Sequence, residues 1–536
     1  MRYIPRVSNE RTLNAYATGL IGRRTFIARL VAAGVGLATA TTWAHVLAPP
    51  AAATASGAAG SSLVPARHGA VLRGMELPGR QRNREGRFGF MFKGLAPFLP
   101  PDELLLELAG TMVEPSGVPF DQDDNPRIPG GFTFLGQFID HDLTRDTTPM
   151  PEQQADPLAT SNFRSPRYDL DSVYGPAVDA YYHPDDPAKL LVTGAGSAEA
   201  PHDIPRASDG TGILGDPRND ENLLVCQHAL VIMRFHNAVV DHLRDELVPA
   251  AGLFEEACRL TRWHYQWLVV HDFLPRVVGE VTMAKVFEER GGRPPKVTLR
   301  YYRPGNANRP MMPLEFSVAA YRFGHSMVRP AYLVAGTTVA KVFGTASDTN
   351  LNGSRPIPPN LVVHWPNFYE FDGEKAPQRT RLINSDLSLP LFNLPATVVP
   401  PPDPLVSLAA RNLIRGKRLG LASGQQVAQA MGVEPLSNAE LGLDGAGWEG
   451  QAPLWFYVLK EAELHHAGRH LGAVGGRIVA EVLVGLLQRD PTSYLRQDPS
   501  FRPAPPLAAA GGRFVMQDLL RFASRARPVV ASASMS

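Results

Sequence analysis

Apolar residues spaced at three- and four-residue intervals dominate this chain and constrain its fold more than any other feature. That spacing places them on one face of an α-helix, whereas runs that alternate apolar and polar residues, as half-buried strands do, are scarce. The helical spacing is clearest at 131–143, 220–247, 251–272, 314–328, 404–415, 452–467 and 473–488. The sequence therefore predicts a mainly α-helical protein.

The distribution of proline and glycine predicts how these helices are organised. The chain contains 49 prolines and 48 glycines, which indicates long loops around the helical core. The proline-rich breaks lie at 146–157, 353–359, 399–404 and 502–506. Each break is short compared with an interdomain linker, so we expect one large helical domain over residues 96–536 with little β-structure. Residues 56–95, rich in glycine and arginine, predict an extended arm.

The N-terminus has the pattern of an export signal. Arg23 and Arg24 precede an apolar run over 30–47, and alanines follow it. Paired arginines, an apolar stretch and small residues are typical of twin-arginine signals. Polar residues and a tryptophan interrupt the run, which disfavours the alternative of an uncleaved membrane anchor. We expect residues 1–55 to be removed, leaving a secreted or periplasmic protein with no stable membrane anchor.

Charge and cysteine content exclude several classes of protein. Without residues 1–55 the chain has 47 basic and 51 acidic residues, so nothing predicts a basic face for nucleic acid. Cys226 and Cys258 both lie in apolar helical runs, which excludes a disulfide framework and a thiolate metal cluster.

An unusual polar cluster lies within the first predicted helix. Gln137, Asp140 and His141 share one helical face through their three- and four-residue spacings. Asp142 points about 100° further round the helix. Taken alone, a buried histidine beside two aspartates is more often a hydrogen-bonded structural group than a catalyst.

Oxygen-bearing side chains alternate along residues 165–171. In an extended loop Ser165, Asp169 and Asp171 point to one side, where the carbonyl of Arg167 can join them. Hard oxygen ligands of this kind suit Ca²⁺. A solvated acidic turn fits the spacing equally well, and the spacing alone does not decide between the two.

Three further motifs occur later in the chain: Gly215-Asp216-x-Arg218-x-x-Glu221, Arg322-x-Gly324-His325 and Asn412-x-x-Arg415. Together with the two segments above, they resemble the animal-type haem peroxidases of the peroxidase-cyclooxygenase superfamily. Each has an ordinary explanation by itself: acidic residues at a helix start, a core histidine, and a pair on one helix face. All five motifs follow the family's order over roughly residues 85–490, which makes chance agreement very unlikely.

The resemblance implies a catalytic side of the haem and a ligand side. His141 is implied as the distal histidine, with Gln137 as its hydrogen-bonding companion and Arg218 as the distal arginine. His325 is implied as the proximal ligand of the haem iron. Asn412 is implied to accept a hydrogen bond from the other ring nitrogen of His325.

The resemblance also implies further contacts with haem b and a calcium site. Arg322 and Arg415 are expected near the haem propionates, and Asp140 and Glu221 match carboxylates that form ester bonds to haem. The expected calcium ligands are Asp142, Ser165, Arg167, Asp169 and Asp171.

The implied function is a secreted peroxidase. It would use H₂O₂ to oxidise small donors such as halides, thiocyanate or phenols through a ferryl intermediate, as a monomer or a non-covalent oligomer. Two alternatives remain: a fatty-acid dioxygenase of the same superfamily, and a haem-binding adhesion or scaffold protein with vestigial activity. In the dioxygenases a radical tyrosine lies three residues before the proximal histidine. Here that position is Arg322, with Tyr321 one residue out of register, which favours a peroxidase.

Overall fold

The computed structural model describes most of the chain after residue 85. The described residues are 86–115, 123–145, 161–162, 166–175, 182–193, 202–291, 293–306, 309–345, 349–396, 398–399, 403, 405–444, 447–509 and 512–529. The predicted export signal, most of the predicted arm and Ser165 lie outside them. The chain divides into two units, Met1–Pro65 with Val399–Val406, and Ala66–Val398 with Ser407–Ser536. All described features below belong to the second unit.

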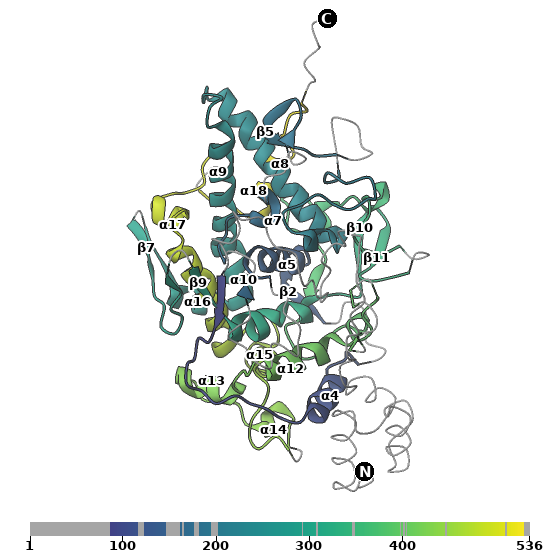
Figure 1. Cartoon of the computed structure of the whole chain (residues 1–536), viewed down its shortest axis with the longest axis vertical. Coiled ribbons are helices and arrows are strands. Elements are labelled where there is room, and N and C mark those ends of the chain that lie inside the picture. Colours follow the sequence, from purple (N-terminus) through teal and green to yellow (C-terminus); the bar gives the residue numbers. More distant parts are fainter. Residues whose placement is uncertain are drawn as a thin grey trace, which may run out of the picture. The chain divides into compact units, whose positions relative to one another are not determined.

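Helices are the main regular structure of this unit (Figure 1), so the predicted fold class is confirmed. The α-helices are α4 (Asp102–Thr111), α5 (Gly131–Leu143), α7 (Asp171–Tyr174), α8 (Leu223–Asp245), α9 (Leu253–Leu268), α10 (Leu274–Val278), α11 (Glu280–Val286), α12 (Leu408–Arg418), α13 (Gly424–Met431), α14 (Asn438–Leu441), α15 (Leu454–His466), α16 (Ala473–Arg489), α17 (Tyr494–Gln497) and α18 (Met516–Ala523). The π-helices are η4 (Val269–Phe273) and η5 (Glu315–Ala319). The 3₁₀ helices are η3 (Pro217–Asp220), η6 (Ala320–Met327), η7 (Pro359–Leu361), η8 (Trp365–Asn367) and η9 (Leu389–Phe392).

Two predicted helices differ from the structure, one in its helix type and one in its first residue. Residues 314–328 form η5 followed by η6 rather than one α-helix, and the backbone breaks at Ala319, with φ −127° and ψ −77°. The segment predicted at 404–415 begins later, as α12, because the side chain of Ser407 accepts a hydrogen bond from the backbone N–H of Ala410 and caps the helix there.

Strands in the described part of the chain are short. One sheet has the order β3 (Ser161–Asn162), β1 (Gly86–Gly89), β9 (Arg309–Pro313), β8 (Gly305–Asn306). In it β1 runs parallel to β9, with Phe88 opposite Met312. The two-stranded pairs are β2 (Asp124–Pro129) with β12 (Arg379–Arg381), β4 (Tyr182–His183) with β5 (Asp186–Leu190), β6 (Phe287–Arg290) with β7 (Arg293–Val297), and β10 (Ala331–Ala335) with β11 (Thr338–Lys341).

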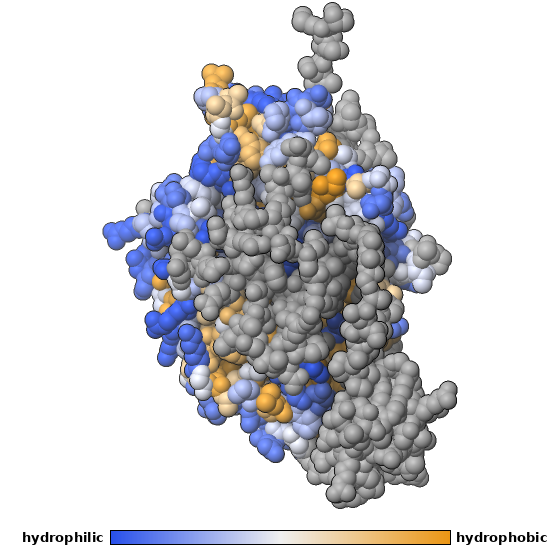
Figure 2. Space-filling model, viewed as in Figure 1, coloured by the Kyte–Doolittle hydropathy of each residue, from blue (hydrophilic) through white to orange (hydrophobic). Residues whose placement is uncertain are grey.

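The core is built around α8. An 18-residue stretch of this helix has a mean hydropathy of 1.4, which makes α8 the one helix among the described residues that is long and apolar enough to cross a membrane. Yet 94% of that stretch is buried in the fold. It packs against α5, α9 and α18, and α8 and α9 lie side by side in Figure 1. Cys226 on α8 and Cys258 on α9 are buried free thiols, as predicted. On the face shown in Figure 2, the described surface is mainly hydrophilic, with scattered apolar patches.

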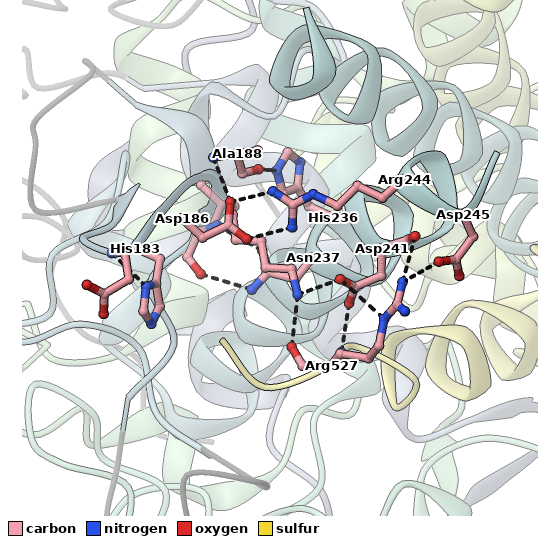
Figure 3. Close-up of polar contacts among 12 residues, drawn as sticks. His183, Asp186, Ala188, His236, Asn237, Asp241, Arg244, Asp245 and Arg527 are labelled. Atoms are coloured by element: carbon pink, nitrogen blue, oxygen red, sulfur yellow. Dashed lines mark hydrogen bonds and ion pairs between the residues drawn. The ribbon is translucent and has the colours of Figure 1, made fainter. Parts of the chain in front are cut away.

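A polar network fixes α8 to the hairpin of β4 and β5 (Figure 3). Arg244 binds the carboxylate of Asp186 through two hydrogen bonds of 2.7 Å. Three residues before Arg244 on α8, Asp241 pairs with the buried Lys189 at 2.6 Å. Asp241 also accepts a hydrogen bond from the backbone N–H of Arg527 at 2.7 Å. The helix is therefore anchored along its C-terminal half, while its N-terminal end reaches the candidate site.

Candidate functional site

A large cavity lies where α5, η3, η5 and η6 meet. It holds about 1230 Å³ of empty space, the part open to solvent included. Five residues predicted from the sequence line it together: Gln137, Asp140, Glu221, Arg322 and His325. Most of its remaining wall is apolar, with several aromatic rings. Helices α5 and η6, almost 200 residues apart in the sequence, thus line the same cavity.

Close packing fixes the start of α5, the helix with the polar cluster. The backbone N–H of Gly131 donates to the carbonyl of Phe368 at 3.0 Å. A side chain at Gly131 would meet the ring of Tyr369 at 2.4 Å, so only glycine fits here. Farther along α5, the Asp140 carboxylate accepts a hydrogen bond from the Thr144 hydroxyl at 2.9 Å.

His141 lies behind the cavity wall, not on it. Its side chain is fully buried, and its Nδ1 atom is 2.8 Å from Oδ1 of Asn219. The amide of Asn219 is oriented by its Nδ2, which donates to the carbonyl of Ser172 at 3.2 Å. Because the Asn219 oxygen can only accept, Nδ1 of His141 carries the proton and Nε2 keeps its lone pair. Sequence reasoning missed Asn219, although it directly follows Arg218.

Arg218 also lies outside the cavity lining. Its guanidinium binds the Asp216 carboxylate at 2.8–3.2 Å and donates to the carbonyls of His141 at 3.1 Å and Thr144 at 2.6 Å. Burial disfavours its charged form, but the neighbouring Asp216 outweighs burial and raises the pKa of Arg218. The structure thus shows a cation that holds the last turn of α5, next to His141.

On η6, His325 is held by a short chain of polar groups. Asn412 on α12 is 1% exposed, and its Nδ2 lies 2.8 Å from Nδ1 of His325. Its Oδ1 accepts a hydrogen bond from Arg322 at 2.6 Å. We expected Asn412 to accept from His325, and the structure shows the opposite orientation, because arginine can only donate and therefore takes the amide oxygen.

The orientation of the Asn412 amide determines which ring nitrogen of a neutral His325 carries the proton. If Asn412 donates to Nδ1, the proton of a neutral His325 resides on Nε2. An imidazole that ligates a metal through Nε2 must carry its proton on Nδ1. Ligation therefore requires the Asn412 amide to turn so that its oxygen, which has two lone pairs, accepts from Nδ1. The sequence reasoning also missed Trp455, whose indole N–H donates to the carbonyl of Arg322 at 3.2 Å and so supports η6. Arg415, one turn after Asn412, is half-buried and does not line the cavity.

The predicted calcium loop packs against the end of α5. Both carboxylate oxygens of the buried Asp142 accept backbone hydrogen bonds, from Leu170 at 3.3 Å and Ser172 at 3.4 Å. Asp169 accepts from the backbone N–H of Asp171 at 3.3 Å. Burial, followed by repulsion from Asp171 and Asp142, raises the pKa of Asp169 well above its usual value. Three of the predicted ligands are therefore brought together.

Of the other two predicted calcium ligands, the structure describes only Arg167. Arg167 is half-buried in this loop, and Ser165 is not among the described residues. Within the described ranges, no group of three or more His, Cys, Asp or Glu side chains is arranged to hold a metal ion. Arg262 on α9, which sequence reasoning missed, donates to the carbonyl of Asp169 at 2.6 Å and ties the loop to α9.

The chain resembles known peroxidases in sequence. Residues 183–442 match the family model described as animal haem peroxidase. A peroxidase-like protein of Margaritifera margaritifera is 34% identical over 119 residues, and chorion peroxidase of Drosophila melanogaster is 33% identical over 118 residues. These matches cover 22% and 21% of this chain, and the chain spans only 14% of each relative.

Solved structures share the fold over a longer span. Peroxidase A from Dictyostelium discoideum has a TM-score of 0.53 at 13% identity, over 83% of this chain and 94% of the other. A fatty acid alpha-dioxygenase from Oryza sativa, solved with palmitic acid, has a TM-score of 0.54 at 15% identity, over 83% and 80%. At these identities the likeness concerns the fold alone.

Proposed function

Because the chain carries a domain of the animal haem peroxidase family, we propose that it binds haem and uses hydrogen peroxide to oxidise small donors. The observation that supports this most strongly is the shared cavity, which collects His325 from η6 and Gln137 and Asp140 from α5. The family match and the cavity lining support the same activity.

The residues present fit haem. Largely apolar walls, several aromatic rings and a histidine on the wall suit an aromatic macrocycle with a central metal. Gly324, beside His325, has no atom within 4 Å of the position where a side chain would begin, so there is open space next to the expected ligand. His325 would hold the iron, and haem would supply the redox chemistry.

His141 is our candidate for moving the peroxide proton. With Nδ1 committed to Asn219, Nε2 is the ring atom that can take a proton and return it. Gln137 lines the cavity one helical turn before His141. Arg218 places a permanent positive charge beside them, and its bonds to the carbonyls of His141 and Thr144 position the end of α5.

Finer features of the proposal concern attachment, calcium and export. Asp140 and Glu221 line the same cavity, which supports ester attachment of haem after exposure to peroxide, and mass spectrometry of the protein checks this.

We propose that Ca²⁺ binds at Asp142, Asp169 and Asp171, with Ser165 and the carbonyl of Arg167. A bound ion would offset the repulsion among the three carboxylates. We also propose export through the twin-arginine signal in residues 1–55.

A second candidate is a fatty-acid dioxygenase, which the fold shared with the Oryza sativa enzyme favours. Against it, the position three residues before His325 is Arg322. The test is to load the protein with haem and follow donor oxidation with peroxide and oxygen uptake with palmitic acid. Donor oxidation alone supports the peroxidase, and oxygen uptake that needs the fatty acid supports the dioxygenase. Haem binding with neither activity supports a haem-binding scaffold.

A further inference from the structure

A second hollow lies at the surface, at the end of α9. It holds about 930 Å³ of empty space, open solvent included, and is lined in part by Trp267, His271, Glu289 and Arg502. It shares no lining residue with the main cavity. We call it the Trp267 cleft.

An aromatic pair forms one wall of the Trp267 cleft. The rings of Trp267 and His271 stack with centroids 3.7 Å apart and an interplanar angle of 19°. The guanidinium of Arg502 lies 5.3 Å from the Trp267 ring and pairs with Glu289 at 2.9 Å. Burial, followed by the nearby Arg502, lowers the pKa of His271 to about 3, so the imidazole is neutral at neutral pH. The paired charges of Arg502 and Glu289 offset each other, and a neutral aromatic ligand suits this wall.

The same helical segment reaches the main cavity. Trp267 lies next to the last residue of α9, and η4 follows directly and ends at Phe273, which lines the main cavity. Six residues separate Trp267 from Phe273 along this continuous helical segment. Phe273 in turn lies 6.3 Å, centroid to centroid, from Tyr321, whose ring also lines the main cavity. An inserted π-helix of this kind often occurs at functional sites.

From this geometry we propose that the Trp267 cleft is a second oxidation site for phenols too large to enter the main cavity. Their electrons pass through Trp267, which is only 5% exposed, and by way of Tyr321 to that cavity. The inference rests on the proposed peroxidase function. Trp267 and Tyr321 are the oxidisable rings on this route, and Phe273 at the end of η4 contacts the ring of Tyr321.

The chemistry balances with peroxide as the oxidant. Each phenol at the cleft loses one electron to oxidised Trp267 and its hydroxyl proton to Glu289 or water, and leaves as a phenoxyl radical. Two phenols supply two electrons and two protons. The O–O bond of one peroxide breaks, and both of its oxygen atoms leave as water.

The test compares one phenol in two sizes. Free tyramine is small, whereas tyramine coupled to dextran presents the same phenol on a polymer that cannot enter the main cavity. We expect the haem-loaded protein to oxidise both with peroxide. Trp267→Phe should leave free tyramine oxidation within about twofold and reduce oxidation of the polymer at least tenfold.

Two variants separate electron transfer from packing. Trp267→Tyr loses the indole as the phenylalanine variant does but keeps an oxidisable ring, so we expect it to restore much of the polymer oxidation. Trp263→Phe alters the same helix one turn earlier, outside the cleft, and should oxidise both donors normally. Electron paramagnetic resonance after peroxide without donor should show a tryptophan radical in the wild type and in Trp263→Phe, and none in Trp267→Phe.

Two outcomes overturn the proposal while leaving the proposed function intact. One is free tyramine oxidation without polymer oxidation by the wild-type protein. The other is polymer oxidation by Trp267→Phe at the wild-type rate. If the haem-loaded wild type oxidises neither donor, the proposed function fails, and this inference fails with it.

Discussion

Asn219 fixes the tautomer of His141, because Oδ1 of Asn219 lies 2.8 Å from Nδ1 of the buried imidazole. The carbonyl of Ser172 holds the amide in that orientation. The base proposed for peroxide activation is therefore set by a residue 78 positions away in the sequence.

Asn219→Leu should slow the reaction of the haem-loaded protein with peroxide. Leucine fills similar space but offers no acceptor to Nδ1, so the proton is no longer confined there, and we expect a loss of about 10- to 100-fold. His141→Ala should lose about 10²- to 10⁴-fold, because the base itself is gone. Stopped-flow absorption measures both rates. Equal rates in Asn219→Leu and the wild type would contradict the assignment.

Asn412→Asp should lower the reduction potential of the bound iron. A carboxylate can only accept, so it must take the Nδ1 proton of His325 and increase the electron density that the imidazole gives to the metal. Asn412→Leu removes the partner and should not lower the potential. Spectroelectrochemical titration of the haem-loaded variants gives the values. If Asn412→Asp and wild type have the same potential, Asn412 does not control the proximal imidazole.

Added Ca²⁺ should raise the melting temperature of the wild-type protein, because an ion that binds the native state stabilises it by mass action. Asp169→Ala and Asp171→Ala should melt at lower temperature and no longer respond to Ca²⁺. The matched control is Asp209→Ala, which alters an exposed aspartate elsewhere. Calcium-free active wild-type protein, shown by elemental analysis, would defeat the calcium proposal.

Replacing His236 should weaken the acid sensitivity of the fold. Its Nδ1 lies 3.1 Å from the Tyr174 hydroxyl, and its Nε2 lies 3.0 Å from the carbonyl of Ala188. Burial lowers the pKa of His236 from 6.5 to about 4. The unfolded chain therefore binds a proton between pH 6.5 and 4 that the folded chain does not, and stability is lost as the pH falls through this window.

His236→Gln, which offers a donor and an acceptor but does not titrate, should show a shallower loss of unfolding free energy across that window. The difference should approach about 1.4 kcal/mol per pH unit, the value for one proton. Urea unfolding at several pH values measures it. His183→Gln, on the neighbouring hairpin in Figure 3, provides the control. An unchanged slope in His236→Gln would show that His236 does not contribute.

Much of the scaffold follows from the sequence because its helices have a strong apolar periodicity. The helix predicted at 131–143 matches α5 at both ends, and 473–488 differs from α16 by one residue. At 314–328 the same reasoning predicts one α-helix, since apolar spacing does not distinguish it from η5 followed by η6. That local geometry depends on the packing of His325 and Arg322 against α12 and α15.

The motifs also predict which residues converge but not how each is bonded. Gln137, Asp140, Glu221, Arg322 and His325 do line one cavity. The orientation of Asn412 was not predictable, because it depends on Arg322 reaching across 90 residues to take the amide oxygen. Spacing along a helix carries no information about such a competing donor.

Haem binding through His325 is the central claim, and the absorption spectrum of His325→Ala tests it most directly. The purified wild-type protein and the variant are titrated with haem, with Asn219→Leu alongside as a variant that should still bind. The account predicts one haem per chain with a Soret band in the wild type and in Asn219→Leu, and no stoichiometric haem in His325→Ala. A normal Soret band at one haem per chain in His325→Ala would contradict it.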